Sequence, residues 1–589
     1  IFAAVNAAKS GNSVLLVEEY EHIGGLMTGG LSFSDFISTE GLSGDFNDYR
    51  FRVMAYYQTK YGVNSKQVKD SYFGVNAEPH VTLQIFHGLL KEHQVKVLTR
   101  HVIVASSVNK LSEERHQITS VSFKNLQNNK RVDFSAKVFI DATYEGDLAV
   151  AAGAEYRIGR EDRTEFCERF AGHIFTDKGQ ILTGGTGQAD AKVQAYNFRI
   201  IMTDSAENRI MIQKPDHYKR EDYLPILEAF HSGKVSEIFT EDATGILRVQ
   251  PLVNRKADIN DIKNAAVRLS SLGRNYDYPN GTREVRQRII QEHKQHILGM
   301  IYFLQNDEGI PLHIRQKARV WGMAKDEFTD NDHFPYRLYI REARRIMGNE
   351  VFTEHNTYQA ANSIRSVLNT NSVAVGDYAL NCHGVSAPGP IYPDKTEGDF
   401  SFVPQPFQIP YGVMLPKHFT NLIVPVAISS SHVGFCGIRL EPTWSSLGQA
   451  AGIAASLSIR GKMTVDQVNI ADIQSILLKR GGKLIYISDV EADSPYFEAT
   501  QYYGTKGFFH DLYHLHEMVL KPRVIHKLQY RDASQYHDFQ PNTVLTKTLA
   551  NSWIKQLPPT EREDAQRKLS AKSWTRGEFL NELYQNKMK

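Results

Sequence analysis

The sequence predicts an α/β fold in which helices pack against a parallel sheet. Three segments indicate this fold. A helix rich in alanine, 2–9, is followed by an apolar strand at 13–17. A second apolar strand at 138–140 runs through a polar turn into a small-residue helix, and a third at 422–427 leads to a helix near 447. Short apolar runs of this kind are typical of buried parallel strands.

The first strand ends in two acidic residues, Glu18 and Glu19. In a dinucleotide-binding unit, an acidic residue at this point accepts hydrogen bonds from the adenosine ribose. We choose Glu18 for this role, with Glu19 as the competitor. In such a unit the first strand and its G-x-G-x-x-G loop come before this helix, so we expect them upstream of Ile1, in a chain truncated at its N-terminus. The alternative is an ordinary αβ unit with a solvated acidic loop.

A glycine-rich loop follows and favours the nucleotide-binding interpretation. Residues 24–30 include four glycines. Glycine permits positive φ and a close approach of the backbone to a ligand. Such a loop presents amide N–H groups to a pyrophosphate. We therefore predict that Gly24, Gly25, Thr28 and Gly29 contact the cofactor.

The next segments complete the predicted nucleotide-binding domain. An amphipathic pattern predicts a helix over 81–92, followed by a strand at 95–98. Alternating segments then predict a three-stranded meander at 102–106, 118–124 and 131–136.

The second apolar strand continues into the run IDATYEGDLAVAAGA. This run resembles the strand end that closes over FAD in FAD-dependent oxidoreductases of the glutathione-reductase type. Those proteins carry A-T-G at this turn, and Tyr144 stands here in place of the glycine. The resemblance implies a Rossmann-type FAD-binding domain, with Asp141, Ala142, Thr143 and Asp147 at the cofactor. Ligands of open α/β sheets bind where a strand ends and a helix begins.

The third element, 421–455, resembles a branch of this superfamily that is sometimes labelled putative xanthan lyases. The resemblance implies that Gly448, Gln449 and Ala450 lie at the flavin, where a helix N-terminus stabilises negative charge on the reduced ring. Pro425 and Val426 stand where many relatives carry Gly-Asp or Gly-Arg, so the ribityl contact of that acid is not carried over. The three elements occur in the chain order of the family.

This chain order predicts a split FAD-binding domain. Its first part is 1–152 and its second part is 409–490. Between them we expect an inserted α+β substrate domain, 153–408, which caps the flavin and excludes water. The remainder, 491–589, is predicted to be a small helical appendage whose aromatic residues form its own core.

Four residues are candidates for catalysis or substrate binding. His432 precedes the predicted flavin-facing helix and would exchange a proton near neutral pH; alternatively, it caps a turn. Arg341 lies in a Y-x-R-E-x-R-R segment similar to one in this branch; alternatively, it is a solvated arginine beside an internal Arg–Glu pair. His383 ends a strand and loop of the family, with a structural histidine as the alternative. Arg439 either holds substrate or pairs with Glu441.

The predicted function is hydride transfer from a small polar substrate, such as a carbohydrate or carboxylate, to N5 of FAD. A polysaccharide lyase and a non-catalytic flavin-binding protein are the alternatives. We expect a small-molecule substrate and an electron acceptor of unknown identity as partners. The net charge of +2 does not favour binding to nucleic acid, and no apolar run is long enough to span a bilayer.

The three cysteines, Cys167, Cys382 and Cys436, are far apart and form no C-x-x-C motif. Their spacing therefore predicts neither a metal site nor a redox dithiol. The sequence leaves open the oligomeric state and whether the protein is cytoplasmic or exported.

Overall fold

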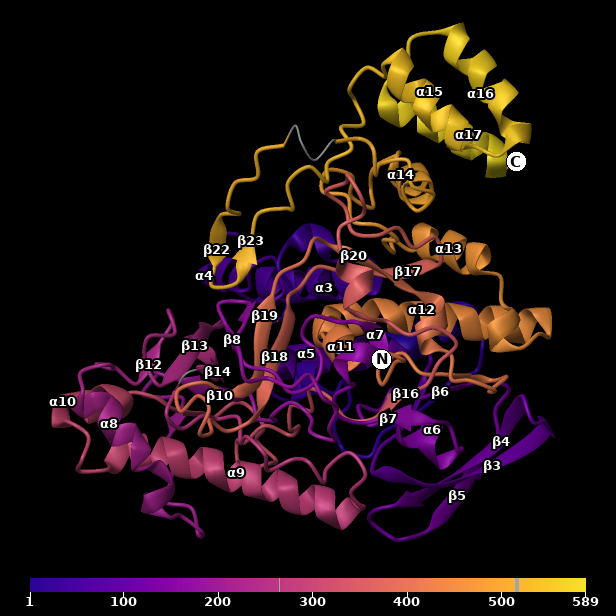
Figure 1. Ribbon diagram of the computed structural model, residues 1–589. Coiled ribbons are helices and arrows are strands. Elements are labelled where there is room, and N and C mark those ends of the chain that lie inside the picture. The colour runs from indigo at the N-terminus through magenta and orange to yellow at the C-terminus, as the bar shows by residue number, and fades with distance from the viewer. Residues whose placement is uncertain (264, 514–517, 589) are drawn as a thin grey trace.

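The computed structural model describes residues 1–263, 265–513 and 518–588. Helices, short strands and long connections form one main body, and a group of helices projects from one end of it (Figure 1). No helix among the described residues is both long and apolar enough to cross a membrane.

Two pairs of parallel strands form the predicted nucleotide-binding part. β1 (Leu15–Val17) pairs with β2 (Lys96–Leu98), and β6 (Phe139–Ile140) pairs with β21 (Leu422–Ile423). The parallel arrangement is confirmed for these strands. The two pairs are not joined into one ladder, however, and β1 is only partly buried, with Leu15 38% exposed. The exposed side of β1 faces a cavity that β6 also lines.

The small-residue helix α1 (Phe2–Lys9) packs mainly against another helix, α12 (Glu441–Gly461). At Gly452 the two helices approach so closely that an added Cβ would lie 2.3 Å from the carbonyl oxygen of Ala3. The small side chains thus permit a helix–helix crossing, whereas we expected contact with a sheet.

The antiparallel meander agrees with the prediction. Its strands are β3 (His101–Ser112), β4 (Arg115–Asn125) and β5 (Arg131–Phe134), and the preceding helix is α5 (Pro79–Glu92). Other helices of this part are α2 (Leu26–Gly29), α3 (Gly44–Tyr61), α4 (Lys66–Asp70) and α6 (Asp147–Ala151).

A six-stranded sheet and a long helix occupy the middle of the chain. The strand order is β11-β15-β10-β14-β13-β12. Residues of α9 (Arg283–Asn306), including Ile297 and Met300, share one apolar core with Ile200 and Ile259 of the sheet. The strands are β10 (Ile200–Thr203), β11 (Arg209–Ile210), β12 (Phe239–Thr240), β13 (Leu247–Pro251), β14 (Lys256–Asn260) and β15 (Gly322–Ala324).

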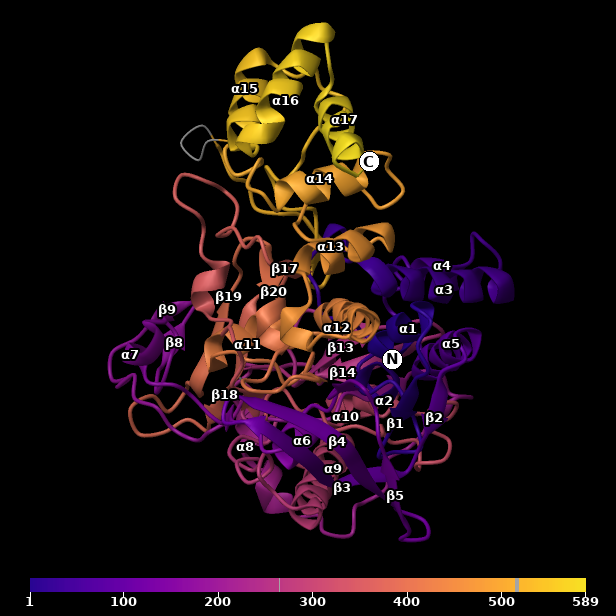
Figure 2. The ribbon, with the colours of Figure 1, turned by 90° about the vertical axis from the view of Figure 1, so that its right-hand side faces the viewer.

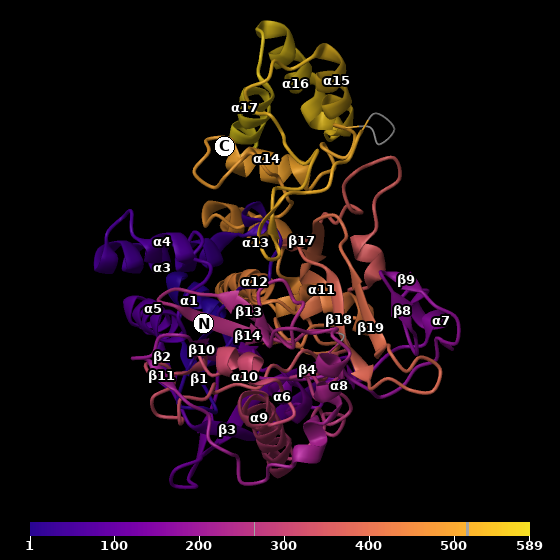
Figure 3. The same cartoon turned by 90° about the vertical axis from the view of Figure 1, so that its left-hand side faces the viewer.

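The expected boundary at 408 falls inside a strand. β17 (Ser372–Gly376) and β20 (Phe407–Pro410) form an antiparallel pair beside α12 and α13 (Ile470–Lys479) (Figure 3). Val373 and Ile409 belong to the same apolar core as Leu447 of α12. This part of the predicted insertion therefore packs with the segment that follows it. Two further strands, β18 (Leu380–Ser386) and β19 (Glu397–Phe402), also form an antiparallel pair.

Two helix boundaries differ from the prediction. His432 begins the short helix α11 (His432–Ile438) and does not lie on a turn, because the side chain of Ser431 caps this helix by accepting a hydrogen bond from Gly434 N. The following helix begins at Glu441, with Pro442 in its first turn, where proline is tolerated. It therefore starts earlier than the expected position near Leu447.

The C-terminal region is helical in part (Figure 2), and the stretch between its first two helices contains the antiparallel strands β22 (Ile525–Lys527) and β23 (Tyr530–Arg531). Its helices are α14 (Phe497–Gly504), α15 (Lys547–Gln556), α16 (Pro559–Ala571) and α17 (Arg576–Met588). Their buried aromatic residues, including Trp553 and Phe579, belong to the same apolar core as α12. The expectation of a separate core is therefore wrong, because α14 and the segment after it connect the two parts.

We predict that Gly452→Ala destabilises the protein by about 1–3 kcal/mol, because the new methyl group would overlap the backbone of α1. The matched control is Gly88→Ala in α5, where nothing lies within 4 Å of the added Cβ. There, alanine should stabilise the helix by up to about 1 kcal/mol. Denaturant unfolding followed by circular dichroism would measure both; equal effects would contradict the close crossing of α1 and α12.

Candidate functional site

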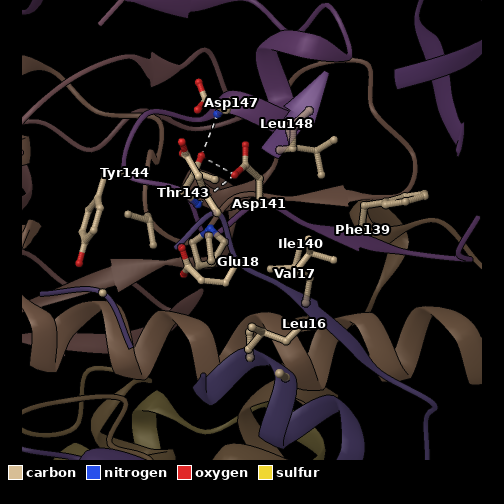
Figure 4. A pocket seen from close by; sticks show the side chains of 18 of the residues that line it. Leu16, Val17, Glu18, Phe139, Ile140, Asp141, Thr143, Tyr144, Asp147 and Leu148 are labelled. Atoms are coloured by element: carbon tan, nitrogen blue, oxygen red, sulfur yellow. Dashed lines mark hydrogen bonds between the residues drawn. The ribbon is translucent and has the colours of Figure 1, made fainter. Parts of the chain in front are cut away.

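A cavity of about 780 Å³ lies where the three predicted elements meet. Glu18 from the end of β1, Thr143 from the turn after β6 and Gly448 from α12 all line it. Figure 4 shows Glu18 beside the Asp141–Thr143 turn, above a helix. Segments far apart in sequence thus converge on one cavity, as expected, and its volume is in the range of small-molecule and cofactor sites.

Glu18 and Glu19 both line this cavity. Glu18 accepts a hydrogen bond from the backbone N–H of Tyr20 at 3.0 Å and forms an ion pair with Arg337. The guanidinium of Arg337 also stacks on the Tyr20 ring, 3.7 Å from its centroid. Glu19 pairs with the more exposed Arg283 at 3.1 Å. Glu18 is therefore the more firmly positioned of the two carboxylates.

Only half of the predicted glycine-loop residues reach the cavity. Gly24 and Gly25 line it, with φ values of 98° and 60°. Thr28 turns inward, and its hydroxyl donates to the carbonyl oxygen of Ile23 at 2.5 Å. Gly29 lies outside the cavity lining, where an added Cβ would meet the side chain of Arg337 at 2.7 Å. Thr28 and Gly29 thus shape the loop and do not line the cavity.

The turn after β6 is held by its own hydrogen bonds. The carboxylate of Asp141 accepts from Thr143 N at 3.0 Å, from Thr143 Oγ1 at 2.7 Å and from Ala149 N at 2.9 Å. Thr143 Oγ1 accepts in turn from Asp147 N at 2.8 Å. These contacts make Asp141 a residue that orders the turn, and they leave the backbone of Ala142 and Thr143 on the cavity wall.

Of the three residues predicted on the last helix, only Gly448 lines the cavity. Gln449 Oε1 lies 3.4 Å from the backbone N of Asp45, and Ala450 belongs to the apolar core. Successive residues of a helix point in directions about 100° apart, so three neighbours do not share one face.

Four arginines on the cavity wall were not predicted as cofactor ligands. Arg286 and Arg344 both pair with Asp147, whereas Arg337 and Arg283 pair with the two glutamates at the end of β1. Arginine side chains bind phosphate oxygens through their planar fork. Arg344 belongs to the Y-x-R-E-x-R-R segment, and Arg337 lies just before it. This arginine-rich stretch could have indicated phosphate ligands, but it falls in the predicted substrate domain.

Glu441 also lines the cavity, at the first turn of α12. It accepts a hydrogen bond from the hydroxyl of Tyr144 at 2.9 Å, and burial raises the pKa of its carboxyl to about 7. The expected pair with Arg439 does not form. The guanidinium of Arg439 instead donates to Tyr339 OH at 3.0 Å and to Asn381 O at 2.9 Å.

Three of the four catalytic candidates belong to one group, which we call the arginine cluster: the buried Arg341, Arg439 and Tyr339, and the partly exposed His383. The guanidinium carbons of Arg341 and Arg439 lie 4.6 and 5.7 Å from the centroid of the same Tyr339 ring. Nη1 and Nη2 of Arg341 donate to Ala195 O and to Asn197 Oδ1. Arg341 is therefore not the solvated arginine of the alternative interpretation.

The two arginines of the cluster form no direct ion pair, and the acid linked to the cluster is the buried Asp35, whose Oδ2 accepts a hydrogen bond from Tyr339 OH at 3.4 Å. Among the described residues, neither Arg341 nor Arg439 has a carboxylate oxygen within the 4.0 Å of an ion pair. Burial, together with Arg439, lowers the pKa of Arg341 to about 9. Burial and the same arginines hold the pKa of His383 well below its usual range, so this imidazole is neutral.

His432 occupies a different environment. Its Nδ1 lies 2.8 Å from Glu342 Oε2, and its Nε2 lies 3.7 Å from Cys382 Sγ. Burial lowers the pKa of a histidine, but Glu342 and Cys382 outweigh this effect and raise the pKa of His432 to about 10. Neither His432 nor the arginine cluster belongs to the cavity lining.

The protein has an α/β fold and a cavity in the size range of cofactor sites. The sequence matches the family model "FAD dependent oxidoreductase" over residues 1–477. The chain therefore belongs to this family.

Two solved structures show a distant likeness. One is THI4 of Thermovibrio ammonificans, at 15% identity and a TM-score of 0.19, over 27% of this chain and 61% of that one. The other is AlpK, at 12% identity and a TM-score of 0.22, over 44% of this chain and 40% of that one. This chain thus aligns with less than two thirds of either structure. No curated protein matches the sequence.

We predict that Glu18→Gln weakens FAD binding about 10- to 100-fold, the effect of losing a hydrogen bond to a charged acceptor. The matched comparison is Glu19→Gln, which also loses an arginine partner but should change the affinity less than threefold. Equilibrium dialysis of each variant against FAD measures the difference. A larger loss of FAD affinity in Glu19→Gln than in Glu18→Gln would indicate that Glu19, and not Glu18, contacts the ribose.

A second prediction concerns Glu441. Its carboxyl has a pKa near 7 in the folded protein and an ordinary value of 4.5, so the folded state binds the additional proton. The resulting stabilisation is complete below about pH 4.5 and is lost as the pH rises through about 7. Relative to wild type, Glu441→Gln should therefore become more stable over this interval.

Thermal unfolding of the FAD-free protein at a series of pH values would test this. The control is Glu563→Gln, at an exposed position on α16, which should leave the pH profile unchanged. A constant stability difference between wild type and Glu441→Gln would show that Glu441 does not titrate in this interval.

Proposed function

We propose that the protein holds FAD in this cavity and oxidises a small anionic substrate, with a carboxylate as the recognised group. The observation that carries the substrate proposal is the pair of buried arginines, Arg341 and Arg439, that lack an acidic partner among the described residues. A buried charge without compensation costs several kcal/mol. A site that retains two such charges is suited to a ligand that supplies the opposite charge.

The polar groups on the cavity wall fit FAD. Glu18 would accept from the ribose hydroxyls, the backbone of Gly24 and Gly25 would approach the pyrophosphate, and Gly448 would lie at the flavin end. The arginines on the wall supply positive charge for the pyrophosphate. On this assignment, β1, β2, β6 and β21 with α1 and α12 form a Rossmann-type domain that is split by an inserted substrate domain. Bound FAD would supply a hydride acceptor at N5.

The segment 337–345 connects the cavity with the arginine cluster. Arg337 and Arg344 line the cavity, whereas Tyr339 and Arg341 belong to the cluster. Arg439 lies two residues before Glu441, which lines the cavity. A substrate carboxylate held by the two arginines would therefore lie next to the wall of the cofactor cavity. The planar guanidinium forks bind a carboxylate through paired hydrogen bonds.

We assign proton acceptance to His383 and not to His432. His383 is neutral, and its Nδ1 has no hydrogen-bond partner among the described residues. Its Nε2 lies 3.4 Å from the amide nitrogen of Asn381, which can only donate, so Nε2 is the nitrogen that would accept the proton. An anion bound at Arg341 and Arg439 would offset the positive charge that lowers the pKa of His383, so substrate binding would make this residue a stronger base. Both ring nitrogens of His432 are already directed at Glu342 and Cys382.

We predict that Arg341→Lys raises KM for anionic substrates at least tenfold, because lysine keeps the charge but loses the paired hydrogen bonds. The matched control is Arg365→Lys. Arg365 is also buried and donates to two backbone carbonyls, Tyr486 O and His537 O, outside the arginine cluster. Anaerobic bleaching of the flavin absorbance by a panel of hydroxy and amino acids, and by their uncharged amides, provides the measurement.

Bleaching by the acids and not by the amides is the expected result. Equal bleaching by the amides would contradict recognition of a carboxylate. If no compound bleaches the flavin and an unsaturated product forms from an acidic polysaccharide, the lyase alternative replaces oxidation. FAD that stays oxidised without any product would favour the non-catalytic alternative.

A further inference from the structure

Cys382, Cys436 and His432 meet in the interior, although Cys382 is far from the other two in the sequence. Sγ of Cys382, Sγ of Cys436 and a ring nitrogen of His432 lie within 4.8 Å of one another. All three residues are at most 1% exposed. Cys382 comes from β18, whereas His432 and Cys436 are four residues apart on α11 and therefore share one face of that helix. We call this group the thiol–imidazole cluster.

The spacing within the cluster suits a shared metal ion. His432 Nε2 and Cys382 Sγ are 3.7 Å apart. A tetrahedral zinc ion, with bonds of about 2.0–2.1 Å to nitrogen and about 2.3 Å to sulfur, separates these two atoms by about 3.6 Å. The two side chains thus already stand at the distance that a zinc ion between them requires.

The neighbouring polar groups resemble the outer ligands of a metal site. Glu342 Oε2 lies 2.8 Å from His432 Nδ1 and so directs Nε2 toward the cysteines. A carboxylate behind a histidine ligand is a recurrent arrangement in zinc sites. Gln194 Nε2 donates to Cys436 Sγ at 3.3 Å, and Arg345 balances the charge of Glu342 at 3.1 Å.

The rest of the surroundings is apolar. Phe170, Leu380, Phe400 and Val433 pack in one cluster with both cysteines. Two thiolates and one divalent cation would leave the site neutral, as an apolar environment requires.

A second group of possible metal ligands differs from the thiol–imidazole cluster. Glu78, His80 and Glu327 also have ligand atoms within 4.8 Å of one another. Here, however, the ammonium of Lys256 lies 2.7 Å from Glu78 and 2.6 Å from Glu327. That group already contains its cation, so it offers no comparable place for a metal.

We propose that Cys382, His432 and Cys436 bind one zinc ion, with a fourth position left for water or a small ligand. Thiolate and imidazole are the preferred ligands of zinc. The ion would fasten α11 to β18. His383 follows Cys382 on β18, and Arg439 follows directly after α11. Zinc would therefore position the arginine cluster without touching the substrate, and its binding does not depend on flavin.

Metal analysis of the purified protein tests the proposal. The protein is produced with an affinity tag that lacks histidines, and its metals are measured by inductively coupled plasma mass spectrometry. We expect about one zinc per chain in wild type and at least a tenfold lower content in Cys382→Ser and Cys436→Ser. The control is Cys167→Ser: this cysteine is exposed and lies outside the cluster, so zinc should be retained.

A second measurement does not depend on the folding of the variants. Wild-type protein is stripped with a chelator under reducing conditions and titrated with cobalt(II). Binding at the cluster should give thiolate-to-cobalt charge-transfer absorption that saturates at one equivalent, and zinc should abolish it. Three results would overturn the proposal: wild type without zinc and without this absorption, undiminished zinc in the two serine variants, or a native Cys382–Cys436 disulfide found by mass spectrometry.

Discussion

The parallel pairing of β6 with β21 is the contact on which the rest of the site depends. It aligns Phe139 with Leu422, so the first and last parts of the matched family region meet in one ladder. The side chain of Asn421 reinforces this junction by bonding both the N–H and the carbonyl oxygen of Ile118, each at 2.9 Å. The turn that carries Thr143 and the helix that carries Gly448 face the same cavity because these strands are paired.

The second organising feature is the segment 337–345, which serves two sites. Its arginines have different partners at the cavity and in the arginine cluster. Arg337 and Arg344 pair with acids at the cavity, whereas Arg341 is buried without an acid. The paired arginines order the cavity wall, whereas on the proposed function the unpaired one would bind an anion. One short stretch of chain thus couples the cofactor cavity to the proposed substrate position.

Local patterns predicted the elements of the fold well. The helix at the start, the four strands that form the parallel pairs and the antiparallel meander follow from apolar periodicity and small-residue content, but the pairing of the parallel strands was not predicted. The errors have two origins. The start of α12 at Glu441 had a local signal, Pro442 in the first turn, which we did not use. The packing of α1 against α12 depends on a partner distant in sequence and leaves no signal in α1 itself.

The sequence by itself determined which strands end in polar turns and which helices have side chains small enough for close packing. Backbone preference and the spacing of apolar residues are local properties of the chain. The resemblance to flavoproteins added the prediction that Thr143 and Gly448 lie at the same site as Glu18, and all three line one cavity. Only the tertiary structure decided what surrounds each buried polar side chain. His432 meets two cysteines, and Arg341 meets no acid. These environments arise from contacts between distant segments, and the charge and reactivity of a buried group depend on such contacts.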